Sequence, residues 1–165
     1  MTSIYIDADA CPMQNEVFQV ADRRGLRALV VANGNRPLPR PRSLNAEFVL
    51  VEGDAGKADD SIAEHIGDGD VCVSEDIPLA ARYLPADARA VSSRGRRWSE
   101  DNIGAALAGR EVFRLLRQMG HETRHTPVEN TDRSRFLVAL DAALIERPRV
   151  AMARGPAGIM PGWDA

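Results

Sequence analysis

The stretch "IYIDADACP" (residues 4–12) decides the fold. Apolar side chains run directly into Asp7 and Asp9, which stand one residue apart before a Cys-Pro pair. An apolar run of this length is typical of a strand that is buried on both faces, as in a parallel sheet. Packing gives no reason for two carboxylates at the end of such a strand, whereas a divalent cation would give one. The stretch therefore predicts a central strand over 3–7 that ends at a metal site.

The rest of the chain alternates short apolar runs with amphipathic segments. We expect strands at 3–7, 27–33, 47–52, 71–76 and 88–93, and helices at 13–25, 58–66, 77–84, 99–107, 111–120 and 131–147. This alternation predicts the α/β class, with a central parallel sheet of about four to five strands flanked by helices. We expect one domain over residues 1–147 and a mobile C-terminal tail over 148–165, where the helical pattern fails.

Composition sets limits on the class of protein. The 165 residues are 44% hydrophobic and 27% charged, as in ordinary globular proteins. No apolar run approaches the roughly 20 residues of a membrane helix, and the N-terminus lacks the basic region of a signal peptide. We therefore expect a cytoplasmic protein with no membrane partner, in which Cys11 and Cys72 are free thiols. The net charge of -3 gives no global attraction to nucleic acid, so such binding would need a local basic patch.

Acidic residues follow several of the expected strands. They form three pairs, which are Asp7 and Asp9, Asp59 and Asp60, and Glu75 and Asp76. Ligands of an open parallel sheet lie outside the carboxyl ends of the strands, where the strand order reverses. Clustered carboxylates raise one another's pKa unless a cation lies among them, and oxygen ligands favour Mg²⁺ or Mn²⁺ over zinc. The alternative is that these acids only cap helices.

Two Arg-rich loops are candidates for binding a polyanion. The first contains Arg94, Arg96, Arg97 and Trp98, and the second contains Arg36, Arg40 and Arg42. In the first loop, Trp98 could stack on an unpaired base. Lys57, the only lysine, could contact a phosphate. The alternative for each is an ordinary solvated surface.

Five short segments form a recognisable series along the chain. They are "DADACP" (7–12), "VAN" (31–33), "ADDSI" (58–62), "SEDIPLA" (74–80) and "RGRRW" (94–98). In this order they resemble the YaiI/YqxD family, also called UPF0178 or DUF188, over residues 3–146. That family is grouped with PIN-like domains, which are three-layer α/β sandwiches with acidic residues around Mg²⁺ or Mn²⁺, and many of which are nucleases.

The resemblance implies roles for individual acids. It places the catalytic and metal-binding acids of PIN-like domains at Asp7, Asp59 and Asp76, and Asp9 belongs to the family's own signature as a further metal ligand. Asp101 is the candidate for a fourth acid. Asp60 and Glu75 rank lower.

The sequence thus predicts a metal-dependent nuclease that hydrolyses phosphodiester bonds, in RNA more than in DNA. One alternative is a PIN-like module that binds nucleic acid or protein without catalysis. Another is a phosphatase, because "YIDAD" (5–9) resembles the nucleophile motif of the haloacid dehalogenase family. "HETRH" (121–125) matches the zinc-protease pattern HExxH, but Gly120 and Pro127 flank it and predict a loop rather than the helix that this pattern needs.

Overall fold

The computed structural model describes residues 1–34, 43–54, 56–122 and 127–146. Three sequence predictions fall on other residues and lie outside the described part of the chain. These are the C-terminal tail over 148–165, the second Arg-rich loop with Arg36, Arg40 and Arg42, and most of "HETRH".

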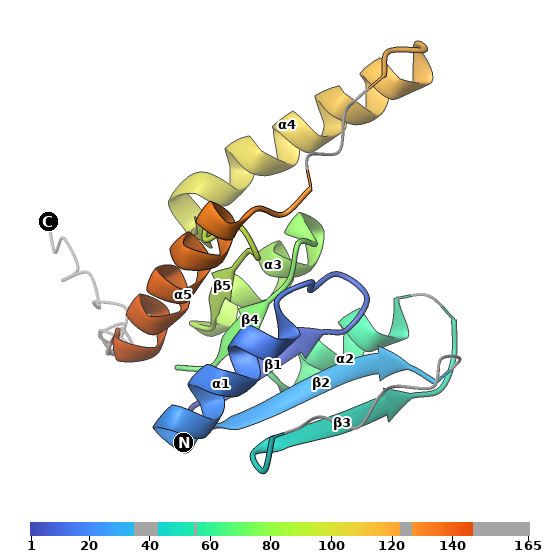
Figure 1. Ribbon diagram of the computed structural model, residues 1–165. Coiled ribbons are helices and arrows are strands. Elements are labelled where there is room, and N and C mark those ends of the chain that lie inside the picture. The colour runs from blue at the N-terminus through green and yellow to red at the C-terminus, as the bar shows by residue number, and fades with distance from the viewer. Residues whose placement is uncertain (35–42, 55, 123–126, 147–165) are drawn as a thin grey trace, which may run out of the picture.

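The fold is a three-layer α/β sandwich built around a six-stranded sheet (Figure 1). The strands are β1 (Ser3–Asp7), β2 (Arg27–Asn33), β3 (Ala46–Val51), β4 (Val71–Val73), β5 (Arg89–Val91) and β6 (Arg97–Trp98). Their order is β3-β2-β1-β4-β5-β6, and all neighbours are parallel except β5 and β6. The predicted class is confirmed. The sixth strand was not predicted, because a pair of residues shows no periodicity.

The helices are α1 (Gln14–Arg24), α2 (Lys57–His65), α3 (Ile77–Tyr83), α4 (Glu100–Gln118) and α5 (Asn130–Ile145), with a short 3₁₀ turn, η1 (Leu84–Ala86), after α3. The prediction of two separate helices at 99–107 and 111–120 is wrong, since α4 runs through both. Gly109 lies between them, but one glycine costs a helix only about 1 kcal/mol and does not end it.

The alternation of side chains along β1 divides the core into two layers. Ile4 and Ile6 face one side of the sheet, where they pack with α1 and α5. Tyr5 faces the other side, where it packs with α2 and α3. Because both faces are covered, the strand needs apolar side chains at consecutive positions, which explains the apolar run that opens the chain.

The strand order places a switch point at the centre of the sheet. The chain runs outward from β1 through β2 to β3 and then returns to β4 on the other side of β1. The strands β1 to β5 all end at the same edge, here called the carboxyl edge. The crevice outside β1 and β4 at this edge is the usual ligand position in such sheets.

Helix α4 stands apart from the rest of the fold. Its N-terminal half packs against α3, with Ile103 next to the core layer of α2 and α3, and none of its residues is buried. Its C-terminal half extends away from the body on the side toward which the parallel strands point (Figure 1). Val112, Phe113 and Leu115 are exposed on this half. Among the described helices, none is long and apolar enough to cross a membrane.

The turn between β5 and β6 depends on Gly95. Its φ is +80°, and a Cβ atom at this position would lie 2.6 Å from backbone atoms of Arg135 on α5. We therefore expect Gly95→Ala to lower the free energy of unfolding by about 2 kcal/mol or more. Urea unfolding would measure this loss. Gly104→Ala on α4, where nothing lies within 4 Å of the added Cβ, is the matched control and should raise stability by up to about 1 kcal/mol. An unchanged Gly95→Ala protein would contradict this close packing.

A candidate carboxylate site at the sheet edge

Asp7 ends β1 at the switch point and is only 5% exposed. Its two carboxylate oxygens accept hydrogen bonds, Oδ2 from the Ser74 hydroxyl at 3.0 Å and Oδ1 from the backbone N–H of Asp9 at 3.2 Å. Burial raises the pKa of Asp7, the two hydrogen bonds oppose this rise, and the charges of Asp9 and Asp76 add to it. The carboxyl group is therefore held in one orientation in a place that disfavours its charge.

Ser74 connects Asp7 to the start of α3. It is buried directly after β4, and its Oγ accepts a hydrogen bond from the backbone N–H of Asp76 at 2.9 Å. Asp76 in turn caps α3, because its Oδ1 accepts the N–H of Leu79 at 3.0 Å. The structural alternative for Asp76, a helix cap, is thus realised. The other carboxylate oxygen of Asp76 is not used by the cap, and the residue is partly exposed, so the same carboxylate can also bind a ligand.

Asp59 reaches the same crevice from the first turn of α2. Asn33 at the end of β2 helps to position this helix, since its Oδ1 accepts the N–H of Ala58 at 3.3 Å. The pKa of Asp59 is raised to about 6, first by burial and then by the negative charges of Asp7 and Asp76, while Arg82 lowers it. The electrostatic effect shows that the structure brings together Asp7, Asp59 and Asp76, which are far apart in sequence. Their catalytic role stays a prediction.

The remaining acids have other surroundings. Asp9 is exposed beside Asp7, in the loop after β1. Asp60 forms an ion pair with Arg82 at 2.9 Å. Glu75 accepts hydrogen bonds from the backbone N–H and the hydroxyl of Ser93, which tie the end of β4 to the end of β5. Asp60 and Glu75 are thus engaged by neighbouring side chains, and their rank as site residues stays a prediction. Asp101 lies in the exposed first turn of α4, and Lys57 is exposed at the start of α2.

The chemistry of this cluster suits a hard divalent cation, although its geometry is not that of a finished site. Within the described residues, no three Asp, Glu, His or Cys side chains are arranged as a ready set of metal ligands. Asp59 and Asp76 are partly exposed and can rotate toward the fixed Asp7. Cys11 and Cys72 are free thiols, as predicted. Both are buried, and burial raises the pKa of Cys11 to about 12. The donor set is therefore carboxylate oxygen, which fits Mg²⁺ or Mn²⁺.

The structure separates the members of the first Arg-rich loop. Arg94 and Arg96 lie in the turn at the carboxyl edge, which the Ser92 hydroxyl closes by accepting the N–H of Arg96 at 3.1 Å. Arg97 lies on β6 and forms an ion pair with Glu146. Trp98 is half-buried against the α2–α3 core layer, with the guanidinium of Arg96 5.3 Å from its ring centroid. The ring predicted to stack on a base is therefore already engaged by protein groups.

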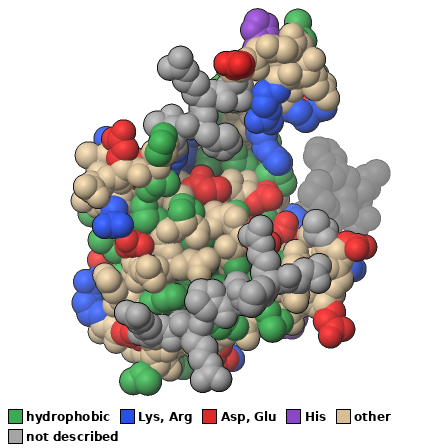
Figure 2. All heavy atoms as spheres, turned by 45° about the vertical axis from the view of Figure 1, so that its right-hand side comes forward, with side chains coloured by type: hydrophobic (Ala, Val, Ile, Leu, Met, Phe, Trp, Pro, Cys, Tyr) green, Lys and Arg blue, Asp and Glu red, His purple; other side chains and the backbone are tan. Residues whose placement is uncertain are grey.

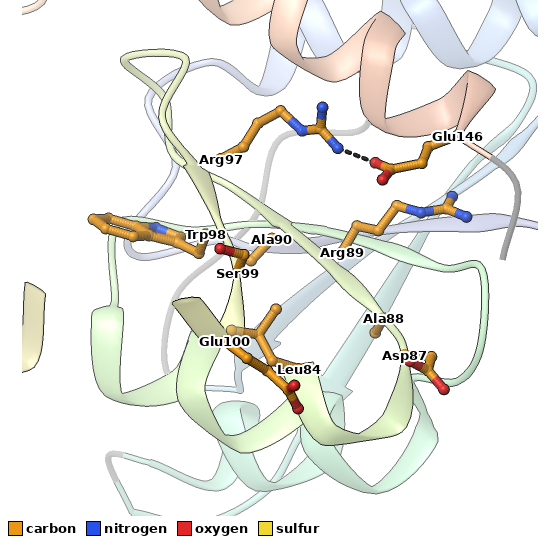
Figure 3. Close-up of a pocket in the computed structure, with 10 residues that line it drawn as sticks. All are labelled: Leu84, Asp87, Ala88, Arg89, Ala90, Arg97, Trp98, Ser99, Glu100 and Glu146. Atoms are coloured by element: carbon orange, nitrogen blue, oxygen red, sulfur yellow. Dashed lines mark hydrogen bonds and ion pairs between the residues drawn. The ribbon is translucent and has the colours of Figure 1, made fainter. Parts of the chain in front are cut away.

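Arg97 and Trp98 also line a pocket at the amino end of β5, between β6, the start of α4 and the end of α5 (Figure 3). Figure 3 shows the Arg97 side chain reaching across to Glu146, with Arg89 beside it. Asp7, Asp59 and Asp76 do not line this pocket. The pocket and the carboxylate cluster are thus separate places on the molecule.

Ser74 is a site residue to which sequence reasoning assigned no role. A serine directly after a strand and beside two acids was visible in "SEDIPLA". Its partner was not, because Asp7 lies 67 positions away along the chain.

The fold and the cluster define the class, an α/β sandwich with an acidic site at its switch point. The model of the DUF188 family, described as "Uncharacterized BCR, YaiI/YqxD family", matches residues 5–146. The chain belongs to the YaiI/YqxD family, as its motifs predicted.

Several members of this family are similar to the chain over most of its length. A UPF0178 protein of Rhodospirillum rubrum is 46% identical over 86% of this chain and 94% of its own length. A UPF0178 protein of Rhodospirillum centenum is 47% identical over 87% and 96% of the two chains. Among solved structures, the crystal structure of a mutant of Rae1 (YacP) from Bacillus subtilis matches with a TM-score of 0.41 and 15% identity, over 87% of this chain and 99% of that one.

The raised pKa of Asp59 predicts how stability depends on pH without metal. Because the folded state holds the proton more tightly than the unfolded chain, this stabilisation is present below about pH 4 and is lost as the pH rises through about 6. Asn cannot ionise, so in EDTA we expect Asp59→Asn to raise the melting temperature at about pH 7.5 and not at about pH 4. Solvent screening of the partly exposed group limits the gain to about 2 °C. Thermal unfolding at the two pH values measures it, and an equal effect at both would contradict the raised pKa.

The Ser74 hydroxyl should be worth more than an ordinary surface hydroxyl. Ser74→Ala removes a hydrogen bond from the buried Asp7 and another from the N–H of Asp76. We expect the free energy of unfolding to fall by about 1–3 kcal/mol, because both groups lose a partner. Ser134→Ala, at an exposed position on α5, is the control and should change it by less than about 0.5 kcal/mol in urea unfolding. Equal losses of stability in Ser74→Ala and Ser134→Ala would show that the Ser74 hydrogen bonds stabilise the fold no more than a surface hydroxyl does.

Proposed function

We propose that this protein is a metal-dependent nuclease that hydrolyses phosphodiester bonds, in RNA more than in DNA. Asp7, Asp59 and Asp76 would hold Mg²⁺ or Mn²⁺, with Asp9 as a further ligand. The observation that carries the proposal is the gathering of three carboxylates from β1, α2 and the cap of α3 at the switch point, with the pKa raised at Asp7 and Asp59. Carboxylates clustered in this way cost stability, which a bound cation would restore.

The residues of the cluster differ in how firmly they are held. Asp7 is fixed by two hydrogen bonds and would set the position of the cation. Asp59 and Asp76 are partly exposed and would complete its ligands while leaving room for a phosphate. A divalent cation bound there would lower the pKa of a coordinated water and stabilise the charge on the attacking and leaving oxygens.

A second candidate function is a PIN-like module that binds nucleic acid or protein without hydrolysis. It is favoured by one observation, the lack of a ready set of three metal ligands among the described residues. The phosphatase alternative shares Asp7 and Asp9 with the nuclease proposal and differs in its substrate, a phosphomonoester. Substrate choice therefore separates the three functions.

The test is cleavage of end-labelled single-stranded RNA by the purified protein with Mn²⁺. We expect Asp7→Asn and Asp59→Asn to reduce the rate by about a hundredfold or more, which corresponds to about 2.7 kcal/mol of transition-state stabilisation. Asp60→Asn is the matched control: it changes the adjacent carboxylate, which is held by Arg82, and should keep the wild-type rate within a few fold. EDTA should abolish cleavage, and DNA of the same sequence should be cut more slowly.

Other results would exclude the proposal. Full activity in Asp7→Asn and Asp59→Asn would mean that the site lies elsewhere or that a contaminant cleaves the RNA. If the wild-type protein binds RNA but cuts neither RNA nor DNA, the nuclease is excluded and the binding module is the remaining function. Hydrolysis of p-nitrophenyl phosphate that depends on Asp7 would instead identify a phosphatase.

A further inference from the structure

The projecting half of α4 carries a row of arginines on one face. Arg110, Arg114 and Arg117 are all exposed and follow the i, i+4, i+7 spacing of a single helix face. At about 100° per residue, all three lie within about 40° of the direction of Ile103. Ile103 is the residue that packs α4 onto the core layer of α2 and α3. The arginine face is therefore the continuation of the face that α4 turns toward the body.

This continuation lies on the same side of the body as the carboxylate site. α3, on which α4 packs, begins at the carboxyl edge with Asp76 as its cap. α4 extends beyond the body on that same side (Figure 1), which is the side on which β1 ends at Asp7. Figure 2 shows basic side chains along the lower side of the projecting part of the molecule, above the acidic side chains at the centre of the face.

We propose that Arg110, Arg114 and Arg117 bind the phosphodiester backbone of a single-stranded nucleic acid, RNA in the first place, and hold it over the carboxylate site. The inference rests on the proposed function, because it assigns the partner of that same site. The sequence prediction relied on the first Arg-rich loop (94–98) for nucleic-acid binding. The present proposal adds a second binding surface, on α4.

The spacing of the arginines fits a charged strand. Arg110 and Arg117 are seven residues apart, which is about 10 Å along the helix, the length over which one strand at duplex rise carries about three phosphates. Within the described part of the chain, no side-chain hydrogen bond or ion pair holds Arg110 or Arg117. Arg114 is held by Glu111, with its Nε 2.9 Å from Oε2. Two of the three guanidinium groups therefore have their donors directed to solvent.

The arrangement is costly to the helix by itself. Like charges four residues apart destabilise a helix by a few tenths of a kcal/mol, and no residue of α4 is buried to offset this. The chain also has a net charge of -3, and the carboxylate cluster repels a polyanion. A row of cations on the same side of the body as the cluster supplies the attraction that a negative backbone needs to approach it.

The test is the fluorescence anisotropy of a short, labelled single-stranded RNA, titrated with protein in EDTA at several salt concentrations. EDTA prevents cleavage, so only binding is measured. For Arg110→Gln/Arg117→Gln we expect affinity at low salt to fall by about tenfold or more, and the slope of log K against log [salt] to lessen by about 1.4, or about 0.7 for each lost phosphate contact. Single-stranded DNA of the same sequence should lose the same factor, because phosphate contacts do not read the sugar.

Two further variants make the result specific. Arg23→Gln/Arg27→Gln changes the net charge equally at the opposite edge of the sheet, where β2 begins, and should leave the slope unchanged. Arg110→Lys/Arg117→Lys retains the charges and should retain the slope. Gln has nearly the helix propensity of Arg, so circular dichroism should show the same helix content in all variants.

The outcomes separate this inference from the nuclease proposal. It is overturned if the wild type does not bind RNA, if Arg110→Gln/Arg117→Gln keeps the wild-type slope, or if the Arg23→Gln/Arg27→Gln control loses as much. Cleavage by a protein whose RNA affinity ignores α4 would support the nuclease and reject the arginine face. RNA binding that depends on α4, without cleavage in Mn²⁺, would support the arginine face and reject the nuclease.

Discussion

The hydrogen bond from the Ser74 hydroxyl to Asp7 joins the ends of the two central strands, and the whole candidate site depends on it. A carboxylate that is 5% exposed is unfavourable unless it has partners, and Ser74 and the N–H of Asp9 are those partners. The same hydroxyl accepts the N–H of Asp76, so one side chain links β1, β4 and the start of α3. Because β1 and β4 flank the switch point, this link places the acids in the crevice that the sheet topology opens.

The site departs from what stability alone would favour. Three carboxylates gather where burial raises the pKa of Asp7 and of Asp59, although apolar or uncharged residues would be more stable there. Residues that lower stability in this way are most often found at functional sites, where stability is lost in exchange for activity. The arginine row on α4 also places like charges four residues apart, which destabilises a helix. The two departures are complementary in charge.

Prediction from sequence worked best where a local pattern had one physical cause. The apolar run before Asp7 predicted β1 correctly, because a strand covered on both faces needs apolar side chains at every position. Prediction was less successful where contacts with distant segments determine the local structure. Nothing near Gly109 shows that α4 continues through it, and β6 forms at Arg97 and Trp98 only because β5 presents a free edge. The sequence predicted that the Trp98 ring is available for stacking on a base, whereas in the structure it packs on a core layer built by other segments.

By itself, the sequence determined the family, the α/β class, the positions of β1 to β5, and the acids that end or follow those strands. Each is written in a short window, as periodicity or as a motif. The fold alone sets which acids share a crevice, which of them contact Arg82 or Ser93, and which face of α4 packs on the body. These depend on strand order and on helix packing, which bring together groups dozens of residues apart. A side chain's charge is a property of its residue, but its pKa and its partners are properties of the fold.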